Sequence, residues 1–373
     1  MAAISDTSGG RNMRIGILTS GGDCAGLNAV IRAVVNRAVR KHGWQVIGIN
    51  QGTDGLIARP VRAMPLDFDS VPGNIMMMSG TILGTTSRGD PFALADSSGT
   101  VTDYSDAIIK GYHELGLEAL IGIGGDGSLS ILSRLAAKGD WNLVAIPKTI
   151  DNDVGLTETA IGFGTAVQVA TEALDRLHFT AASHDRVMIL EVMGRDAGHI
   201  ALHAGIAGAA DVILIPEIPY TLEAIRTKIR RRAERGKNYN LIIVAESVKT
   251  EAGRPVTMEH GDGRRRYGGV GQYLAARIGE MTRAETRVTV LGHVQRGGIP
   301  ASSDRLLGSA FGVYAVDLIA AKNFGRMIAW QNRQVIDVAI EDAIASYVSV
   351  DPDDALVHTA RGLGICLGDD ADD

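Results

Sequence analysis

Short apolar runs alternate with longer amphipathic segments along most of this 373-residue chain. Residues 13–22 (MRIGILTSGG) predict a short buried strand that leads into a glycine turn. Residues 25–43 then carry apolar side chains at helical spacing, and Gly43 marks the end of the predicted helix. The same alternation predicts further strands, with helical segments in most of the gaps, at residues 44–49, 118–123, 142–147, 187–193, 212–215, 241–245 and 287–292.

Strands that are apolar throughout and alternate with helices are typical of a parallel sheet covered on both faces. In such folds ligands bind beyond the carboxyl ends of the strands. Polar, glycine-containing or charged stretches follow six of the predicted strands: TSGGDCAG, GIGGDGS, PKTIDND, EVMGRDAGH, AESV and LGHVQRGG. One such stretch is usually only a turn, but six of them indicate one shared cleft.

Composition narrows the class of protein. The chain is 45% hydrophobic and 21% charged, which suffices for two domains, and its net charge of −6 favours neither nucleic acid nor an anionic membrane as a partner. Two cysteines, Cys24 and Cys366, indicate a reducing compartment rather than a disulfide scaffold. The N-terminal residues have no apolar signal segment, and no apolar run is long enough for a bilayer, so we expect a cytoplasmic protein.

The stretch AIPKTIDND, residues 145–153, ends an apolar strand on Lys148, Asp151 and Asp153. Carboxylates this close cost free energy unless a cation or a proton lies between them. One interpretation is a polar turn in which Asn152 and the aspartates cap the backbone. The other is a site whose chemistry needs these charges.

The stretch GIGGDG, residues 122–127, matches the glycine pattern of dinucleotide-binding turns only weakly. Asp126 lies inside the turn, where its charge would repel a phosphate. A Mg²⁺ ion on Asp126 removes that conflict, because the cation bridges carboxylate and phosphate oxygens. The stretch therefore predicts a metal-assisted phosphate site, and the chain has no Walker P-loop motif.

Next to a Mg²⁺-bound phosphate donor, the 145–153 stretch gains a role in phosphoryl transfer. Asp151 is the candidate base for the acceptor hydroxyl, Asp153 a second carboxylate and Thr149 a hydrogen-bond donor to the phosphoryl oxygens. Arg195 is the candidate cation for the transition state. Cations that could bind a phosphate on the acceptor itself are Arg186, Arg287, His293 and Arg296.

Together these motifs resemble the 6-phosphofructokinase family, from about Met13 to the 340s. The resemblance implies an α/β fold of two Rossmann-like three-layer αβα domains with mainly parallel sheets and an active site in the cleft between them. It implies an ATP/Mg-binding domain, residues 12–162 plus 295–345, and a sugar-phosphate-binding domain, residues 163–294 plus 346–373. The implied reaction transfers a phosphoryl group from ATP to the 1-hydroxyl of D-fructose 6-phosphate, the committed step of glycolysis.

The resemblance also assigns site residues. The nucleotide and Mg²⁺ site would comprise Gly22, Arg88, Asp126, Gly127 and Ser128, with Asp126 at the metal. Asp151 would be the general base, with Thr149, Asp153 and Arg195 around the transferred group. Sugar-phosphate contacts within the subunit would come from Met193, Gly194, Glu246, His293 and Arg296. Arg186 and Arg287 would reach a neighbouring subunit's site, so the resemblance implies a homo-oligomer, usually a homotetramer.

Two positions bear on the phosphoryl donor. In this family, glycine at the position of Gly127 accompanies ATP, whereas aspartate there accompanies pyrophosphate. Lysine at the position of Lys148 is typical of pyrophosphate enzymes, so the pair resembles the mixed-type branch. Because a lysine near phosphates is compatible with either donor, we expect ATP, with a pyrophosphate-dependent enzyme as the alternative.

Other features remain open at this stage. Arg32, Asp211, Arg235 and Lys237 match the family's nucleotide-effector pocket, but Asn36 and His178 replace two expected arginines, so the effector is undetermined. Residues 251–271 form a predicted loop of unassigned role, whose Arg264–Arg266 run is interpreted as a solvated face. Another GGDG-type kinase and a non-catalytic sugar-phosphate sensor are more distant alternatives.

Overall fold

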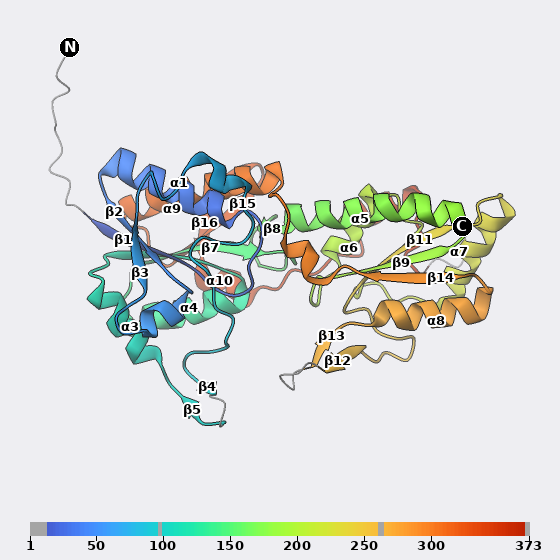
Figure 1. Cartoon of the computed structure of the whole chain (residues 1–373), viewed down its shortest axis with the longest axis horizontal. Helices are drawn as coiled ribbons and strands as arrows, with labels where there is room; N and C mark the ends of the chain where they lie inside the picture. Colours follow the sequence, from blue (N-terminus) through green and yellow to red (C-terminus); the bar gives the residue numbers. More distant parts are fainter. Residues whose placement is uncertain (1–12, 96–98, 260–264, 370–373) are drawn as a thin grey trace, which may run out of the picture. The chain divides into compact units, whose positions relative to one another are not determined.

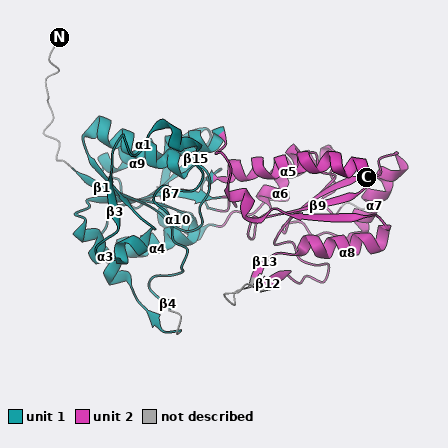
Figure 2. Ribbon diagram, viewed as in Figure 1, with its two compact units in different colours: residues 1–149, 154–161, 302–346 teal, residues 150–153, 162–301, 347–373 magenta. Residues whose placement is uncertain are grey.

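The computed structural model describes residues 13–95, 99–259 and 265–369, and the chain divides into two compact units (Figures 1 and 2). Unit 1 comprises residues 1–149, 154–161 and 302–346; unit 2 comprises residues 150–153, 162–301 and 347–373. Relative to the predicted domain boundaries, residues 150–153, 162 and 295–301 lie in unit 2, and residue 346 lies in unit 1. Hydrogen bonds from backbone amides attach two of these segments to unit 2: the Val348 amide donates to the Asp153 carbonyl, and the Ala301 amide donates to the Thr165 hydroxyl at 2.9 Å.

Unit 1 is built on a mainly parallel sheet with the strand order β16-β15-β7-β6-β1-β2-β3. The neighbours from β15 to β2 are parallel, whereas β16 and β3 pair antiparallel at the two edges. A short strand, β8 (Ile161–Gly162), also pairs with β7. The main strands span Arg14–Thr19 (β1), Gln45–Ile49 (β2), Ala63–Leu66 (β3), Ala119–Gly124 (β6), Leu143–Thr149 (β7), Arg326–Gln331 (β15) and Gln334–Ala339 (β16).

Helices cover both faces of this sheet (Figure 1). On one face α1 (Leu27–Arg37) packs against α9 (Ser302–Ala320), and Gly312 permits the contact, because a Cβ there would lie 2.7 Å from the Val30 carbonyl oxygen. The other face carries α3 (Ser105–Glu114), α4 (Asp126–Gly139) and α10 (Ile340–Ala345). Shorter elements are η1 (Ala38–His42), α2 (Thr53–Ile57), η2 (Gly73–Met77) and the hairpin of β4 (Leu94–Ala95) and β5 (Val101–Thr102).

Unit 2 contains a parallel four-stranded sheet with the order β10-β11-β9-β14. Its strands span Val187–Val192 (β9), Val212–Leu214 (β10), Asn240–Ala245 (β11) and Thr286–Val290 (β14). Every residue of β9 and β11 is buried, as expected for strands with helices on both faces. An isolated parallel bridge between Val212 and Cys366 attaches the C-terminal segment beside β10.

The helices of unit 2 also form two layers (Figure 1). Helices α5 (Phe163–His184) and α6 (His199–Ala207) pack together on one face, and α11 (Ala355–Gly362) packs against α6. Helices α7 (Leu222–Glu234) and α8 (Val270–Thr282) pack together on the other face. The predicted loop 251–271 contains a hairpin of β12 (Thr257–Glu259) and β13 (Arg265–Tyr267), and the 3-10 helix η3 (Gly292–Arg296) follows β14.

The predicted α/β class with mainly parallel sheets is confirmed. The strands predicted from apolar runs all exist, with ends within about two residues of those expected. Within residues 13–95, 99–259 and 265–369, none of the helices combines the length and the hydrophobicity that a bilayer span requires.

Candidate active site

In unit 1, three glycine-rich or charged segments meet at one edge of the sheet. Strands β7, β6 and β1 are neighbours and parallel, with Thr19 in register with Ile123 and Gly124 in register with Pro147. Their carboxyl ends, which lead to Gly21, Gly125 and Lys148, therefore lie side by side. The sheet order thus assembles three of the polar stretches, of which the first lies about a hundred residues before the other two in the sequence.

Gly21, Ser128 and Lys148 lie close together at this edge. A Cβ at Gly21 would lie 2.8 Å from the Ser128 hydroxyl oxygen and 3.3 Å from Lys148 Nζ, and Gly21 has a φ of +82°, which favours glycine. The Lys148 side chain is only 4% exposed, and its ammonium group donates a hydrogen bond to the Gly22 carbonyl. A buried cation and a hydroxyl beside a glycine turn are suited to phosphate oxygens. These three residues and the first turn of α4 are together called the donor subsite.

Helix α4 begins at Asp126, and its N-cap residue, Gly125, has no side chain to offer to the first-turn N–H groups. The amino end of a 14-residue helix favours negative charge, so these N–H groups are available to a phosphate. A Cβ added at Gly127 would meet nothing within 4 Å beyond the helix's own backbone. Asp126 adds a carboxylate at the same turn, and these residues therefore fit a phosphate that carries Mg²⁺.

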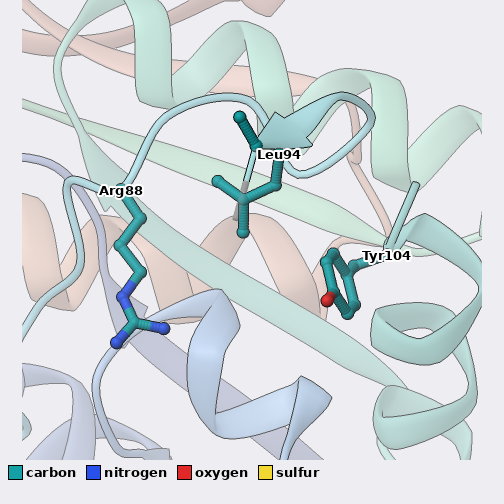
Figure 3. A pocket seen from close by; sticks show the side chains of 4 residues that line it. Arg88, Leu94 and Tyr104 are labelled. Atoms are coloured by element: carbon teal, nitrogen blue, oxygen red, sulfur yellow. The ribbon is translucent and has the colours of Figure 1, made fainter. Parts of the chain in front are cut away.

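Arg88 lines a second cavity of unit 1, of about 380 Å³, together with Leu94, Ala95 and Tyr104. Figure 3 shows Arg88 and Tyr104 on opposite sides of Leu94. The Arg88 side chain is 73% exposed and forms an ion pair of 3.4 Å with Asp54. Arg88 is therefore held only by a weak surface pair, which a phosphate group could replace.

In unit 2, five of the predicted residues line one cavity of about 1050 Å³: Met193, Arg195, Glu246, His293 and Arg296. The residues come from the segments that follow β9, β11 and β14, which are neighbours in the sheet. Gly194, also predicted, lies between Met193 and Arg195 with a φ of +151°. The predicted sugar-phosphate contacts within the subunit thus gather in one place, which is called the acceptor pocket.

Arg195 connects the acceptor pocket to the 145–153 stretch. Its backbone adopts a left-handed φ of +53°, and its amide donates to Glu246 Oε1 at 3.2 Å. Its guanidinium lies 3.7 Å from Asp153, a carboxylate that is only 2% exposed. Asp153 therefore compensates the Arg195 charge. The left-handed backbone of Arg195 is a strained conformation that the surrounding structure must hold in place, so the start of its side chain has a defined position.

Glu246 has an unusual protonation equilibrium. Burial raises its pKa to about 7, the hydrogen bond from the Arg195 amide opposes that shift, and the nearby Asp151 charge adds to it. Asp151 therefore lies close enough to the acceptor pocket for its charge to act on Glu246. Thr149 is the last residue of β7 in unit 1, and Asp151 follows two residues later in unit 2.

Among the residues at the acceptor pocket that were not predicted are Tyr267 and Arg266, which line it, and Gln295, which contacts Met193 without lining the cavity itself. Gln295 is 1% exposed, and its side-chain carbonyl accepts a 2.8 Å hydrogen bond from the Met193 amide. Tyr267 and Arg266 line the cavity from β13, and the Tyr267 hydroxyl donates to Asp196 at 2.7 Å. For Arg266, the interpretation as a solvated face is incomplete, because it faces both solvent and the cavity, whereas Arg264 lies outside the described residues. No sequence signal singles out Gln295, because its contact is a hydrogen bond to a residue about a hundred positions earlier.

Arg186 and Arg287 are not in the acceptor pocket. Both side chains contact Glu285, which precedes β14, and the Arg186–Glu285 distance is 3.0 Å. They lie toward the amino ends of β9 and β14, whereas the pocket lies beyond the carboxyl ends of these parallel strands. Arg186 and Met193 are seven residues apart, which at ~3.3 Å per residue corresponds to about 23 Å along the chain.

The residues that match the effector pocket are split between the units. Arg32 and Asn36 lie on α1 of unit 1, where the Asn36 side chain donates to the Arg32 carbonyl. In unit 2, Asp211 forms a 2.6 Å ion pair with Arg232, and the His178 ring lies 3.1 Å from the Tyr239 hydroxyl. These local partners give no indication of which effector would bind.

Comparison with known proteins identifies the class to which this fold and these sites belong. The sequence pattern of the family described as Phosphofructokinase matches residues 14–319, and the chain belongs to that family. ATP-dependent 6-phosphofructokinase 1 of Synechocystis sp. is 62% identical over 361 residues, covering 97% of this chain and 100% of its own. ATP-dependent 6-phosphofructokinase 1 of Nostoc sp. is 64% identical and covers 96% of this chain and 99% of its own.

A solved structure agrees with the family assignment. Phosphofructokinase of Pichia pastoris, in the T-state, superposes with a TM-score of 0.76 at 28% sequence identity. The match covers 92% of this chain and 36% of that chain. The two-unit α/β architecture is therefore shared with a known phosphofructokinase.

Proposed function

We propose that this chain transfers a phosphoryl group from ATP to the 1-hydroxyl of D-fructose 6-phosphate, giving fructose 1,6-bisphosphate and ADP. The observation that carries the proposal is the presence, in one chain, of the donor subsite at the amino end of α4 and of an acceptor pocket with Arg296 and His293. Relatives that span its whole length and share more than 60% of its residues are named ATP-dependent 6-phosphofructokinases.

In the proposed reaction, the donor subsite of unit 1 holds the phosphates of ATP. The first-turn N–H groups of α4, the Ser128 hydroxyl and the Lys148 ammonium offer donors to phosphate oxygens, and Gly22 and Arg88 border the nucleotide. Asp126 would hold Mg²⁺, which when bound with ATP offsets the charge on the phosphates during transfer.

Asp151 is the proposed general base. It would take the proton of the 1-hydroxyl as that oxygen attacks the transferred phosphoryl group. Thr149 and Arg195 would stabilise the charge on the phosphoryl oxygens, and Asp153 keeps Arg195 in place through their 3.7 Å ion pair. Chain continuity supports a shared role, because Asp151 follows Lys148 by three residues and lies within about 11 Å of it.

The acceptor pocket would bind fructose 6-phosphate. His293 and Arg296 on η3 are the proposed partners of its 6-phosphate, because both can donate charge-assisted hydrogen bonds. Glu246, Met193 and Gly194 would contact the sugar, and the Glu246 carboxylate would accept hydrogen bonds from its hydroxyl groups.

ATP is the proposed donor because the space beside Gly127 is open. An aspartate there would place a carboxylate against the phosphates at the amino end of α4. Lys148 is compatible with either donor, since its ammonium belongs to the donor subsite, where the phosphates of ATP or of pyrophosphate would bind. Pyrophosphate is the alternative donor, and membership of the mixed-type branch rests on this same pair of residues.

We further propose a homo-oligomer, a homotetramer by analogy with the family, in which Arg186 and Arg287 serve a neighbouring subunit. The proposal is supported by their place toward the amino ends of β9 and β14, whereas their own acceptor pocket lies toward the carboxyl ends of these parallel strands. Only another copy could then bring them to a bound 6-phosphate.

A coupled assay that follows fructose 1,6-bisphosphate tests the function. With Mg²⁺ and fructose 6-phosphate, we expect turnover with ATP and little or none with pyrophosphate. Asp151→Ser should lose about 10²–10⁴-fold in kcat, while its affinity for fructose 6-phosphate, measured by calorimetry, stays nearly unchanged. Faster turnover with pyrophosphate would support the alternative donor, and binding without turnover for either donor would support a sensor.

A further inference from the structure

The β12–β13 hairpin forms a wall of the acceptor pocket to which the proposed reaction gives no role. Met258 of β12 and Tyr267 of β13 line the pocket, together with Gly268 and Gly269, which follow β13. The two strands pair antiparallel, with Thr257 opposite Tyr267. The hairpin therefore bounds the pocket in addition to the segments that follow β9, β11 and β14.

A buried carboxylate attaches the exit of the hairpin to β9. Glu191, in β9, is 2% exposed, and its carboxylate accepts hydrogen bonds from the Gly269 amide at 3.0 Å and from the Gly271 amide at 2.8 Å. These amides lie at the amino end of α8, where a carboxylate is favourable. The φ of +93° at Gly269 favours glycine at this turn. The base of the hairpin therefore has a defined position against β9.

A second contact connects the hairpin to the turn that follows β9. The Tyr267 hydroxyl donates to Asp196 Oδ1 at 2.7 Å, and Asp196 directly follows Arg195 in the chain. The other carboxylate oxygen, Asp196 Oδ2, lies 3.9 Å from Arg195 Nε. Hydrogen bonds to a charged acceptor are stronger than those between neutral groups. Tyr267 therefore restrains the Asp196 side chain beside the Arg195 guanidinium.

The turn of residues 194–197 holds Arg195 in an uncommon conformation. Its φ is +53°, that of Gly194 is +151°, and the Ala197 amide donates to the Gly194 carbonyl across the turn at 3.0 Å. A left-handed backbone at a residue other than glycine costs free energy and persists only where surrounding contacts hold it. The Tyr267–Asp196 hydrogen bond is one such contact, because it fixes the residue next to Arg195.

The electrostatic surroundings of Tyr267 agree with this geometry. The hydrogen bond to Asp196 raises the pKa of Tyr267, burial and the charges of Asp196 and Glu246 raise it further, and the Arg195 charge opposes the shift. The hydroxyl therefore remains protonated, and able to donate, at neutral pH. It also lies close enough to Glu246 and Arg195 for both charges to act on it.

We propose that Tyr267 is a positioning residue for phosphoryl transfer, which acts through Asp196 on Arg195. This inference rests on the proposed function, because that function assigns Arg195 to the charge on the transferred phosphoryl oxygens. Asp153 and Asp196 both pair with the Arg195 guanidinium, at 3.7 and 3.9 Å. Asp153 is buried, whereas Asp196 is half exposed, so Asp196 is the partner that the hairpin must hold in place.

Steady-state kinetics on Tyr267→Phe, which removes the hydroxyl and keeps the ring, tests the proposal. With Mg²⁺ and ATP, we expect kcat to fall at least about fivefold and the KM for fructose 6-phosphate to change less than about twofold, because Arg195 acts in the transition state. Tyr314→Phe removes a 3.0 Å hydrogen bond from a tyrosine to Asp337 in unit 1 and should keep the wild-type kcat. A loss confined to KM, or an equal loss in both variants, would overturn the proposal.

A double-mutant cycle tests the route through Asp196. Asp196→Ala removes the acceptor of the Tyr267 hydroxyl and should also lower kcat. If Tyr267 acts through Asp196, the double variant should lose no more than Asp196→Ala alone. Losses that multiply in the double variant would show that the two residues act independently, and the proposal would then be wrong.

Hydrogen exchange of the ligand-free protein tests the restraint without the reaction. In Tyr267→Phe, the amides of residues 195–197 should exchange at least about threefold faster than in the wild type, whereas those of β11 should not change. Unchanged exchange at 195–197 would overturn the proposal whatever the substrate is. A wild type that phosphorylates fructose 6-phosphate with neither ATP nor pyrophosphate would refute the proposed function instead, and faster exchange in the variant would still support Tyr267 as the residue that holds Arg195.

Discussion

The side-chain carbonyl of Gln295 accepts a hydrogen bond from the Met193 amide at 2.8 Å. This bond connects η3, which carries His293 and Arg296, to the segment that follows β9. It therefore fixes the distance between these two parts of the acceptor pocket. Because Gln295 is buried, its removal would leave the Met193 N–H without its partner, at a cost of about 1–3 kcal/mol. Gln295 is thus a positioning residue for the acceptor pocket.

Gln295→Ala should therefore raise the KM for fructose 6-phosphate about tenfold, with a much smaller change in the KM for ATP. Steady-state kinetics on both substrates measures the split. Gln168→Ala, at an exposed position of α5, controls for loss of a glutamine that does not touch the pocket. A lower unfolding midpoint with both KM values unchanged would show that Gln295 supports only the fold.

Glu246 predicts a pH dependence, because its pKa of about 7 lies within the working range of most enzymes. The carboxylate form would accept hydrogen bonds from the sugar, and it falls from about nine-tenths at pH 8 to about one-tenth at pH 6. The KM for fructose 6-phosphate should therefore rise several-fold over this range. Glu246→Gln should show only the weaker dependence that comes from the substrate's own phosphate, and an equal dependence in both proteins would contradict the assignment.

The same group predicts a change in stability. Its folded-state pKa is raised above the ordinary value of 4.5, so folding favours the protonated form. The stability that this preference contributes is fully present below pH 4.5 and is lost as the pH rises through 7. Denaturant unfolding should accordingly find Glu246→Gln more stable, relative to the wild type, at pH 8 than at pH 5. A stability difference that does not change with pH would count against the raised pKa.

Gly127→Asp should destroy ATP use without harming the fold. The space around Gly127 accepts a side chain, and an acidic residue in the first turn of α4 suits the helix dipole. The new carboxylate would repel the donor phosphates, and we expect at least a hundredfold loss of kcat/KM for ATP, about 2.7 kcal/mol. Gly127→Ala is the matched control and should lose far less, and retained ATP turnover in the aspartate variant would refute this interpretation.

The shared-site proposal predicts complementation between two inactive variants. Arg186→Ala with Arg287→Ala in one chain should raise the KM for fructose 6-phosphate strongly, since each contact is of order 1.5–3 kcal/mol. Co-expressed with Asp151→Ser, this double variant should regain activity, because one site per pair combines an intact base with the intact arginines of the other chain. Arg277→Ala, an exposed cation of α8, controls for lost charge. Verified hybrids without activity would place the arginines outside a shared site.

The sequence was sufficient for the buried strands and for the partly exposed β14, but not for every partly exposed strand. β6 and β11 are fully buried, so their apolar runs are continuous and their limits easy to predict. β15 and β16 were not predicted, since partly exposed residues interrupt their pattern. The β12–β13 hairpin was predicted as a loop, because strands of three residues leave too little periodicity to detect.

The candidate sites show a similar division. Residues such as Asp126 and His293 could be predicted because they follow strands whose carboxyl ends meet in a parallel sheet. Gln295 could not, because its role depends on a hydrogen bond to a residue about a hundred positions earlier. Lys228 and Arg361 likewise line one cavity only in the folded chain.

The open space around Gly127 also bears on how this chain can evolve. A single base change converts the commonest glycine codons into aspartate codons, and the fold sets no steric barrier to the product. Because a protein with aspartate at this position is expected to fold normally, selection would act on the substitution only through its effect on the reaction. Lys148 already lies beside the glycine turn of the donor subsite. A single substitution, at Gly127, would then separate the proposed ATP-dependent form of the site from a pyrophosphate-dependent one.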